Sequence, residues 1–85
     1  MSTLLPEALQ AMLKHAAETH KQGNISKAES EYMAALQYSE AVYHRLSPIT
    51  GLVLLEIASF YENCNQKRKA AISVGRANAI IAAHV

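Results

Sequence analysis

The feature that most constrains this 85-residue chain is a pattern that occurs twice. Residues 21–28 begin the first copy and residues 61–70 the second, and each run is followed by small and apolar residues at helical spacing. In the first copy these are Tyr32, Ala35 and Leu36, and in the second they are Val74 and Ala77. A helical repeat cannot bury its apolar face alone and must stack on the next one. The pattern therefore predicts stacked helix pairs that present a surface to a partner, which favours a binding module over an enzyme.

Residues that start and stop helices divide the first half of the chain into two helical stretches. Proline favours the first turn of a helix, whereas glycine and asparagine favour its end. The first helix is therefore expected over about residues 3–22, with Gly23 after it. The second opens at a cap formed by Asn24 or Ser26 and continues as far as Leu46. No strand pattern lies between them.

The second half repeats this arrangement with more apolar residues. Ser47 and Pro48 predict the start of the third helix, because a capping hydroxyl is followed by proline at the first helical position. This helix is apolar around nearly its whole circumference, so we expect it to be buried on more than one side. Asn65 is the expected cap of the fourth helix. The patterns predict a single all-α domain of four antiparallel helices, with one helix pair over about residues 4–46 and the other over 47–85.

The two helix pairs resemble the tetratricopeptide repeat, in which small and aromatic residues recur at fixed positions. The matching residues of the first copy are Ala16, Gly23, Ala28, Tyr32, Ala35 and Leu36. Those of the second copy are Ile57, Ala58, Tyr61, Ala70, Val74 and Ala77. Ala28 and Ala70 lie 42 residues apart, against a family period of about 34, and this surplus resembles the longer-helix variety found in kinesin light chains. The chain departs from the family at Thr19, where an aromatic is usual, and at Asn65, where glycine is usual.

The resemblance implies a groove lined by the first helix of each pair, which binds a peptide or a partner protein. In the first copy its residues would be Gln10, Leu13, Lys14, Ala17, His20 and Lys21. In the second copy they would be Leu52, Leu55, Glu56, Ser59, Glu62 and Asn63. The set lacks the paired lysines and asparagines with which some relatives bind a C-terminal carboxylate. The resemblance thus implies a protein–protein interaction module, an adaptor or a small chaperone, although a helix face that only meets solvent has the same polar pattern.

The apolar residues of the second pair predict self-association. Charged residues make up 18% of the chain and the net charge is +1, whereas about 25% charged residues are usual, so copies repel one another weakly. No polar helix follows Ile80 and Ile81 in this sequence, and together with Leu52 and Leu55 they would form an exposed apolar patch. We therefore expect a homo-oligomer, most simply a two-fold dimer, with Ile80 and Ile81 at its interface.

A basic cluster, Lys67, Arg68 and Lys69, opens the fourth helix and gives an alternative function. Such a cluster can bind nucleic acid or an acidic protein surface. Nucleic acid is the less favoured partner, because the calculated pI is about 7.9 and no aromatic residues interleave with the basic ones. A solvated corner, or a contact with acidic residues of another copy, explains the cluster better.

Catalysis and metal binding require residue patterns that this sequence lacks. There is no Asp, the seven glutamates are scattered, and the four histidines do not have the spacing of a helical zinc motif. The single Cys64 cannot form an internal disulfide. We therefore predict no enzyme activity, no catalytic or metal-ligating residue and no cofactor. Without an apolar run of about 20 residues or a secretion signal over residues 1–6, the expected location is cytoplasmic.

Overall fold

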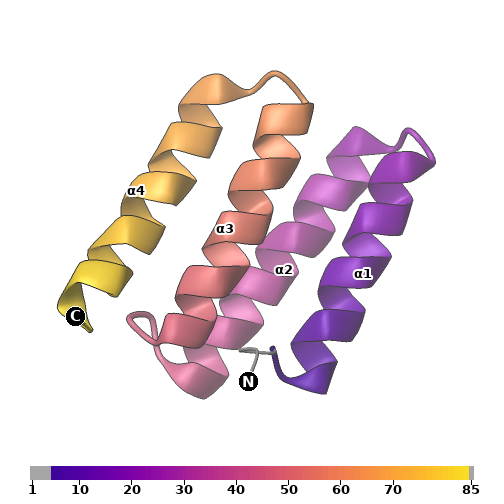
Figure 1. The fold of residues 1–85 in the computed structure, drawn as a ribbon. Coiled ribbons are helices and arrows are strands. Elements are labelled where there is room, and N and C mark those ends of the chain that lie inside the picture. The colour runs from indigo at the N-terminus through magenta and orange to yellow at the C-terminus, as the bar shows by residue number, and fades with distance from the viewer. Residues whose placement is uncertain (1–4, 85) are drawn as a thin grey trace.

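The fold consists of two helical hairpins that stack side by side, as seen in a computed structural model that describes residues 5–84. The first hairpin contains α1 (Glu7–Lys21) and α2 (Ile25–Tyr43), and the second contains α3 (Pro48–Asn63) and α4 (Lys67–Ala83). Neighbouring helices run antiparallel, and α3 lies between α4 and the first hairpin (Figure 1). No strand occurs among the described residues, which confirms the prediction of an all-α fold of four helices.

Local side-chain bonds explain two of the helix starts. Asn24 caps α2, because its side-chain oxygen accepts a hydrogen bond of 3.2 Å from the backbone N–H of Lys27. Ser47 caps α3 in the same way through the N–H of Ile49, at 3.1 Å. Both caps had been expected from the sequence, Asn24 as one of two candidates.

Other boundaries differ from the expected ones. The α2 helix ends at Tyr43 and not at Leu46, because His44 adopts a φ of +95°, which no α-helix contains. Gln66 precedes α4, while the expected cap Asn65 takes a left-handed φ of +60° in the turn. Pro6 precedes α1, and the expected helix start near residue 3 lies outside the described residues.

The core runs between the two hairpins and is richest on α3, as its all-round apolar sequence predicted. Fully or nearly fully buried side chains of this helix are Val53, Leu54, Ile57 and Phe60. The first hairpin contributes Leu9, Leu13, Ala16, Ala28, Tyr32, Ala35 and Leu36 to the same cluster. Each large apolar side chain among them contributes about 1.5–3 kcal/mol when fully buried. The rings of Tyr32 and Phe60, with centroids 4.6 Å apart, join α2 to α3 at the centre of this core.

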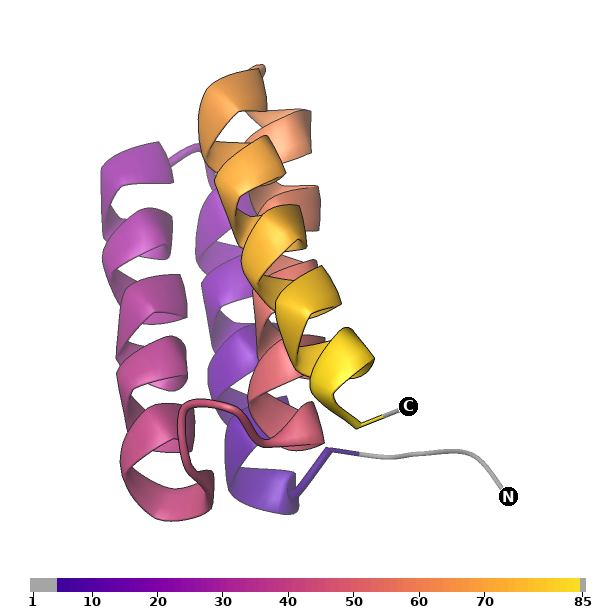
Figure 2. The same ribbon diagram turned by 90° about the vertical axis from the view of Figure 1, so that its left-hand side faces the viewer.

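Figure 2 shows the hairpins from the side, with α4 in front and α2 standing apart at the left. Two ion pairs link the outer sides of these helices. The Nζ atom of Lys69 lies 3.2 Å from an Oε2 atom of Glu29, and an Arg76 guanidinium nitrogen lies 2.7 Å from Glu40. The second hairpin is therefore fixed to the first both through its core and along its outer edge.

Candidate functional site

An apolar groove opens between the first half of α3 and the last half of α4. We call it the α3–α4 groove; its lining residues are Pro48, Gly51, Leu52, Leu55, Ile80, Ile81 and His84. Its volume is about 280 Å³. Ile80, which is 2% exposed, forms the floor together with Gly51. A Cβ atom at position 51 would lie 3.4 Å from the Cγ2 atom of Ile80, so glycine allows the two helices to approach closely here.

Half-exposed aliphatic side chains border this groove. Leu55 on α3 is 40% exposed and Ile81 on α4 is 49% exposed. Val74 is also exposed and lies two helical turns before Ile81, so it extends the apolar border along the same side of α4. Soluble proteins rarely leave large aliphatic groups gathered around an open pocket unless the surface binds something. The groove is thus shaped to receive an apolar side chain.

The four residues of the predicted apolar patch, Leu52, Leu55, Ile80 and Ile81, all line this groove. One correction concerns Ile80. Because it is buried in the contact between α3 and α4, it shapes the floor and cannot itself protrude into a partner, whereas Ile81 can.

The residues of the groove that the tetratricopeptide resemblance implied, on α1 and α3, are only partly available at the surface. On α1, Gln10, Lys14 and Lys21 are exposed, and Ala17 and His20 are half-buried. Leu13 is 7% exposed and belongs to the core, so its assignment to the groove is wrong. On α3, Glu56, Ser59, Glu62 and Asn63 are exposed.

Contacts between α1 and α3 are made by His20. Its ring meets that of Phe60 edge-on at a centroid distance of 5.1 Å, and its Nε2 atom lies 3.7 Å from the Sγ atom of Cys64. Within residues 5–84 no ion pair joins the lysines of α1 to the glutamates of α3. The lysines of α1 and the glutamates of α3 that were assigned to the groove are therefore exposed but not paired with each other.

The basic cluster is exposed, but one of its members has a structural role. Lys69 pairs with Glu29 and lies 5.5 Å from the centre of the Tyr61 ring. The Tyr61 hydroxyl donates a 2.7 Å hydrogen bond to the same carboxylate. Burial, followed by the bond to Glu29, raises the pKa of Tyr61 to about 12. The bonds from Tyr61 and then Lys69 lower the pKa of Glu29. Lys67 and Arg68 are exposed as well and take part in none of the ion pairs found within residues 5–84.

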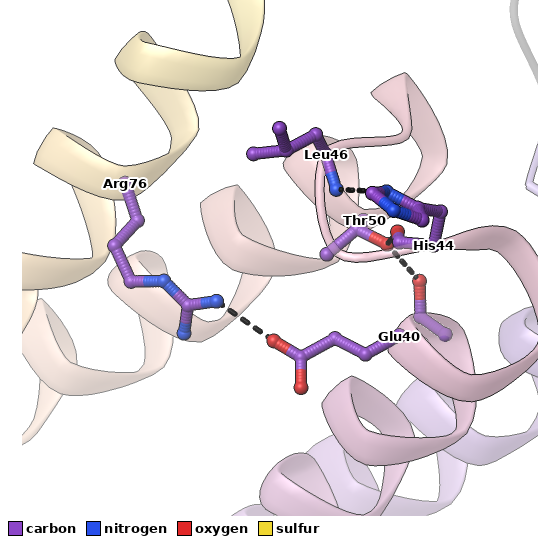
Figure 3. Close-up of polar contacts among 6 residues, drawn as sticks. Glu40, His44, Leu46, Thr50 and Arg76 are labelled. Atoms are coloured by element: carbon purple, nitrogen blue, oxygen red, sulfur yellow. Dashed lines mark hydrogen bonds and ion pairs between the residues drawn. The ribbon is translucent and has the colours of Figure 1, made fainter.

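A polar network at the turn between α2 and α3 was not anticipated from the sequence (Figure 3). The hydroxyl of Thr50 donates to the carbonyl of His44 at 2.7 Å and lies 2.7 Å from the hydroxyl of Ser39. Since the single Thr50 proton is used on His44, Ser39 donates to Thr50. Both hydroxyls are fully buried, and buried polar groups need such partners. A threonine and a serine within otherwise apolar stripes were the only sequence signal of this network.

A further polar contact joins the first two helices. His15 forms a 3.0 Å contact with Glu31 between α1 and α2. Over residues 5–84, no three His, Cys, Asp or Glu side chains converge as a metal site would require. In the same part of the chain, no helix combines the length and the apolar character needed to cross a membrane.

Comparisons of the chain with protein-family models, with curated proteins and with solved structures found no match. The similarity to the tetratricopeptide repeat therefore rests on the sequence pattern described above.

Proposed function

We propose that this chain is a protein–protein interaction module that binds its partner through the α3–α4 groove. The partner that we propose is a second copy of the same chain. The observation that carries the proposal is the groove itself, a pocket of about 280 Å³ bordered by half-exposed Leu55 and Ile81. An adaptor or small-chaperone role is the function that such an exposed apolar groove supports best.

The groove and its border are self-complementary, which favours a second copy. The same face carries a pocket and, beside it, aliphatic side chains that can enter an identical pocket. Two copies related by a two-fold axis would therefore insert Leu55 and Ile81 into each other's grooves. Packing of one hairpin on another already occurs within the chain, where α3 lies against α1 and α2.

Size and charge are also compatible with a dimer. The 16 residues of α3 span about 24 Å, and two adjacent helices are about 20 Å wide. The projected area of this face is thus about 480 Å² per copy, which is below the roughly 800 Å² per partner of a standard interface and corresponds to a small, weak dimer interface. With a net charge of +1, two copies repel each other little.

We further propose that the two hairpins are tetratricopeptide-like repeats. Complete burial of Ala28 and Ala70, the small residues at matching positions of the two copies, supports this proposal. The exposed polar residues of α1 and α3 would then flank the apolar groove. Nucleic-acid binding through the basic cluster is less favoured, because Lys69 is engaged with Glu29.

Charge substitution on α4 tests the proposed function. Ile81→Glu places a carboxylate at the border of the groove, whereas Ile72→Glu, at a position 60% exposed, makes the same change on the side of α4 that faces α2. Burial of the remaining exposed half of Ile81 is worth about 1 kcal/mol per copy, and a buried unpaired charge costs more. We expect Ile81→Glu to raise the dimer dissociation constant by at least about 100-fold.

Sedimentation equilibrium on both variants and the original chain provides the measurement, with circular dichroism to verify that each remains helical. Ile72→Glu should associate as the original chain does. Equal association of the two variants would mean that the α3–α4 groove is not the binding surface.

A further inference from the structure

Two histidines form hydrogen bonds with Leu46 in the turn between α2 and α3: His44 from within the turn, and His84 from the end of α4. The backbone N–H of Leu46 donates a 3.1 Å hydrogen bond to the Nδ1 atom of His44. The carbonyl oxygen of Leu46 lies 2.8 Å from the Nε2 atom of His84. Figure 3 shows the first of these bonds beside the Thr50 network. Both polar groups of one peptide residue are therefore satisfied by imidazole rings from different parts of the chain.

The position of His44 is fixed by its backbone. Its φ of +95° is rare for residues other than glycine. Its N–H donates to the carbonyl of Glu40 at 3.2 Å, and its own carbonyl accepts bonds from the Thr50 hydroxyl at 2.7 Å and the Ser47 N–H at 3.2 Å. The ring cannot leave Leu46 by a backbone rotation without breaking these bonds.

The two contacts require opposite roles from the two rings. An N–H can only donate, so the Nδ1 atom of His44 must be the unprotonated nitrogen of a neutral ring. A carbonyl can only accept, so the Nε2 atom of His84 must carry a hydrogen. Protonation adds a hydrogen to whichever nitrogen lacks one. It therefore destroys the bond at His44, where two N–H groups would face each other, and leaves the bond at His84 intact.

We propose that His44, Leu46 and His84 form an acid-sensitive latch, which is closed while His44 is neutral and opens at the α2–α3 turn when His44 is protonated. Imidazole is the side chain whose charge ordinarily changes between about pH 5 and pH 8. Opening frees the Leu46 N–H from the His44 ring, while the bond between His84 and the Leu46 carbonyl persists.

Among residues 5–84, no ion pair joins His44 to a carboxylate. From α2, Glu40 faces the turn but is paired with Arg76 of α4 at 2.7 Å (Figure 3). Arg45 adjoins His44 in the turn itself, and α3 contributes the neutral Thr50. The first turn of α1, which contains Glu7, lies at the same end of the molecule (Figure 1), and none of the ion pairs includes Glu7 or His44. The other titratable groups beside the turn are His84 and Tyr43, which line a pocket next to it with His44 and Leu46. Within the described part of the chain, the positive charge on His44 thus gains no ion-pair partner that would compensate for the lost bond.

The latch adjoins the proposed binding surface. His84 lines the α3–α4 groove, and Pro48, two residues after Leu46, lies at the same end. Opening of the latch would loosen this end of the groove, so acid would weaken dimerisation; this consequence rests on the proposed function, whereas the latch does not.

Nuclear magnetic resonance on the complete, isotopically labelled chain between pH 8 and pH 5 tests the latch. Long-range proton–nitrogen correlation should show His44 as the tautomer with its hydrogen on Nε2 at pH 8. The Leu46 amide should lose about tenfold of its exchange protection, relative to an unstructured amide at the same pH, in the step in which His44 is protonated. His15→Gln, which removes an exposed histidine elsewhere, should leave this step unchanged.

His44→Asn is the matched variant, because asparagine tolerates a positive φ and its side-chain oxygen still accepts a hydrogen bond without titrating. Its Leu46 amide should show no such step. The latch is refuted if His44 carries its hydrogen on Nδ1 at pH 8, if Leu46 does not follow the His44 titration, or if His44→Asn retains the step. The first two readings need only the original chain, so they decide the question even if the variant does not fold. A monomeric chain that shows the Leu46 step would uphold the latch and refute only the proposed self-association.

Discussion

Two glycines inside helices give a quantitative test of how the second hairpin packs. Gly75 lies within α4, and a Cβ atom built there meets no other atom within 4 Å. Gly51 lies within α3, where the added Cβ would be 3.4 Å from the Cγ2 and 3.7 Å from the Cβ of Ile80. The same substitution, glycine to alanine, therefore enters open space at one position and a tight contact at the other.

At Gly75 only the backbone effect operates. Alanine loses less conformational entropy than glycine when a helix forms, which is worth about 0.5–1 kcal/mol. For a domain of this size, 1 kcal/mol corresponds to about 4–8 °C in melting temperature. We expect Gly75→Ala to raise the free energy of unfolding by about 0.5–1 kcal/mol. At Gly51 the added methyl group also crowds the buried side chain of Ile80. This steric cost offsets part of the same gain, so the free energy of unfolding should rise by less.

Urea unfolding followed by circular dichroism at 222 nm is the assay. All chains are compared at one protein concentration, because association stabilises the folded state. If Gly75→Ala does not raise the free energy of unfolding, Gly75 does not lie in a regular helix with open space beside it. If Gly51→Ala raises the free energy of unfolding by the same amount, α3 and α4 are further apart at Ile80 than the structure shows.

Further outcomes concern the first hairpin and its link to the second. Ala28→Leu should lower the free energy of unfolding by about 1–3 kcal/mol, because Ala28 is fully buried and the larger side chain must displace its neighbours. An unchanged urea midpoint would argue against tight packing of the repeat at this position. The folded state lowers the pKa of Glu29 below 4.5, so the stability it supplies is present above about pH 4.5 and is lost as the pH falls through its folded pKa. Tyr61→Phe should make this acid-induced loss smaller, as measured by urea midpoints between pH 6 and pH 3, and a loss of the original size would assign it to other groups. In the original chain, absorbance near 295 nm should show Tyr61 titrating at about pH 12. Because this pKa lies above the ordinary value of 10.0, the stability that Tyr61 supplies is lost only as the pH rises from about 10 through about 12.

The sequence predicted the helices well because their signals are local. Asn24 and Ser47 cap helices through side-chain bonds to residues two or three positions ahead, and such bonds depend on neighbours in the chain. The end of α2 was missed because it depends on distant residues. The apolar pattern continues to Leu46, but His44 is held in a non-helical conformation by Thr50, which comes from the next helix.

The buried face of α4 shows a second limit. Ala70 and Ala77 fit two neighbouring helical stripes equally well, one through Ile80 and the other through Ile81. Contact with Gly51 selects Ile80 as the buried residue and leaves Ile81 at the border of the groove. Periodicity located the apolar patch correctly, but only the packing of two helices could assign its floor and its border. Leu13 was misplaced for a similar reason, since it lies beside the polar residues of α1 but faces the core.

The most direct test of binding through the α3–α4 groove is a methyl nuclear Overhauser experiment on a mixture of labelled and unlabelled chains. Only contacts between copies give signals in the filtered spectrum. The account predicts signals between the methyl groups of Leu52, Leu55 and Ile81 of one copy and those of the other. A spectrum without signals between copies at high micromolar concentration, or one in which Ile72 makes the contacts instead, would contradict it.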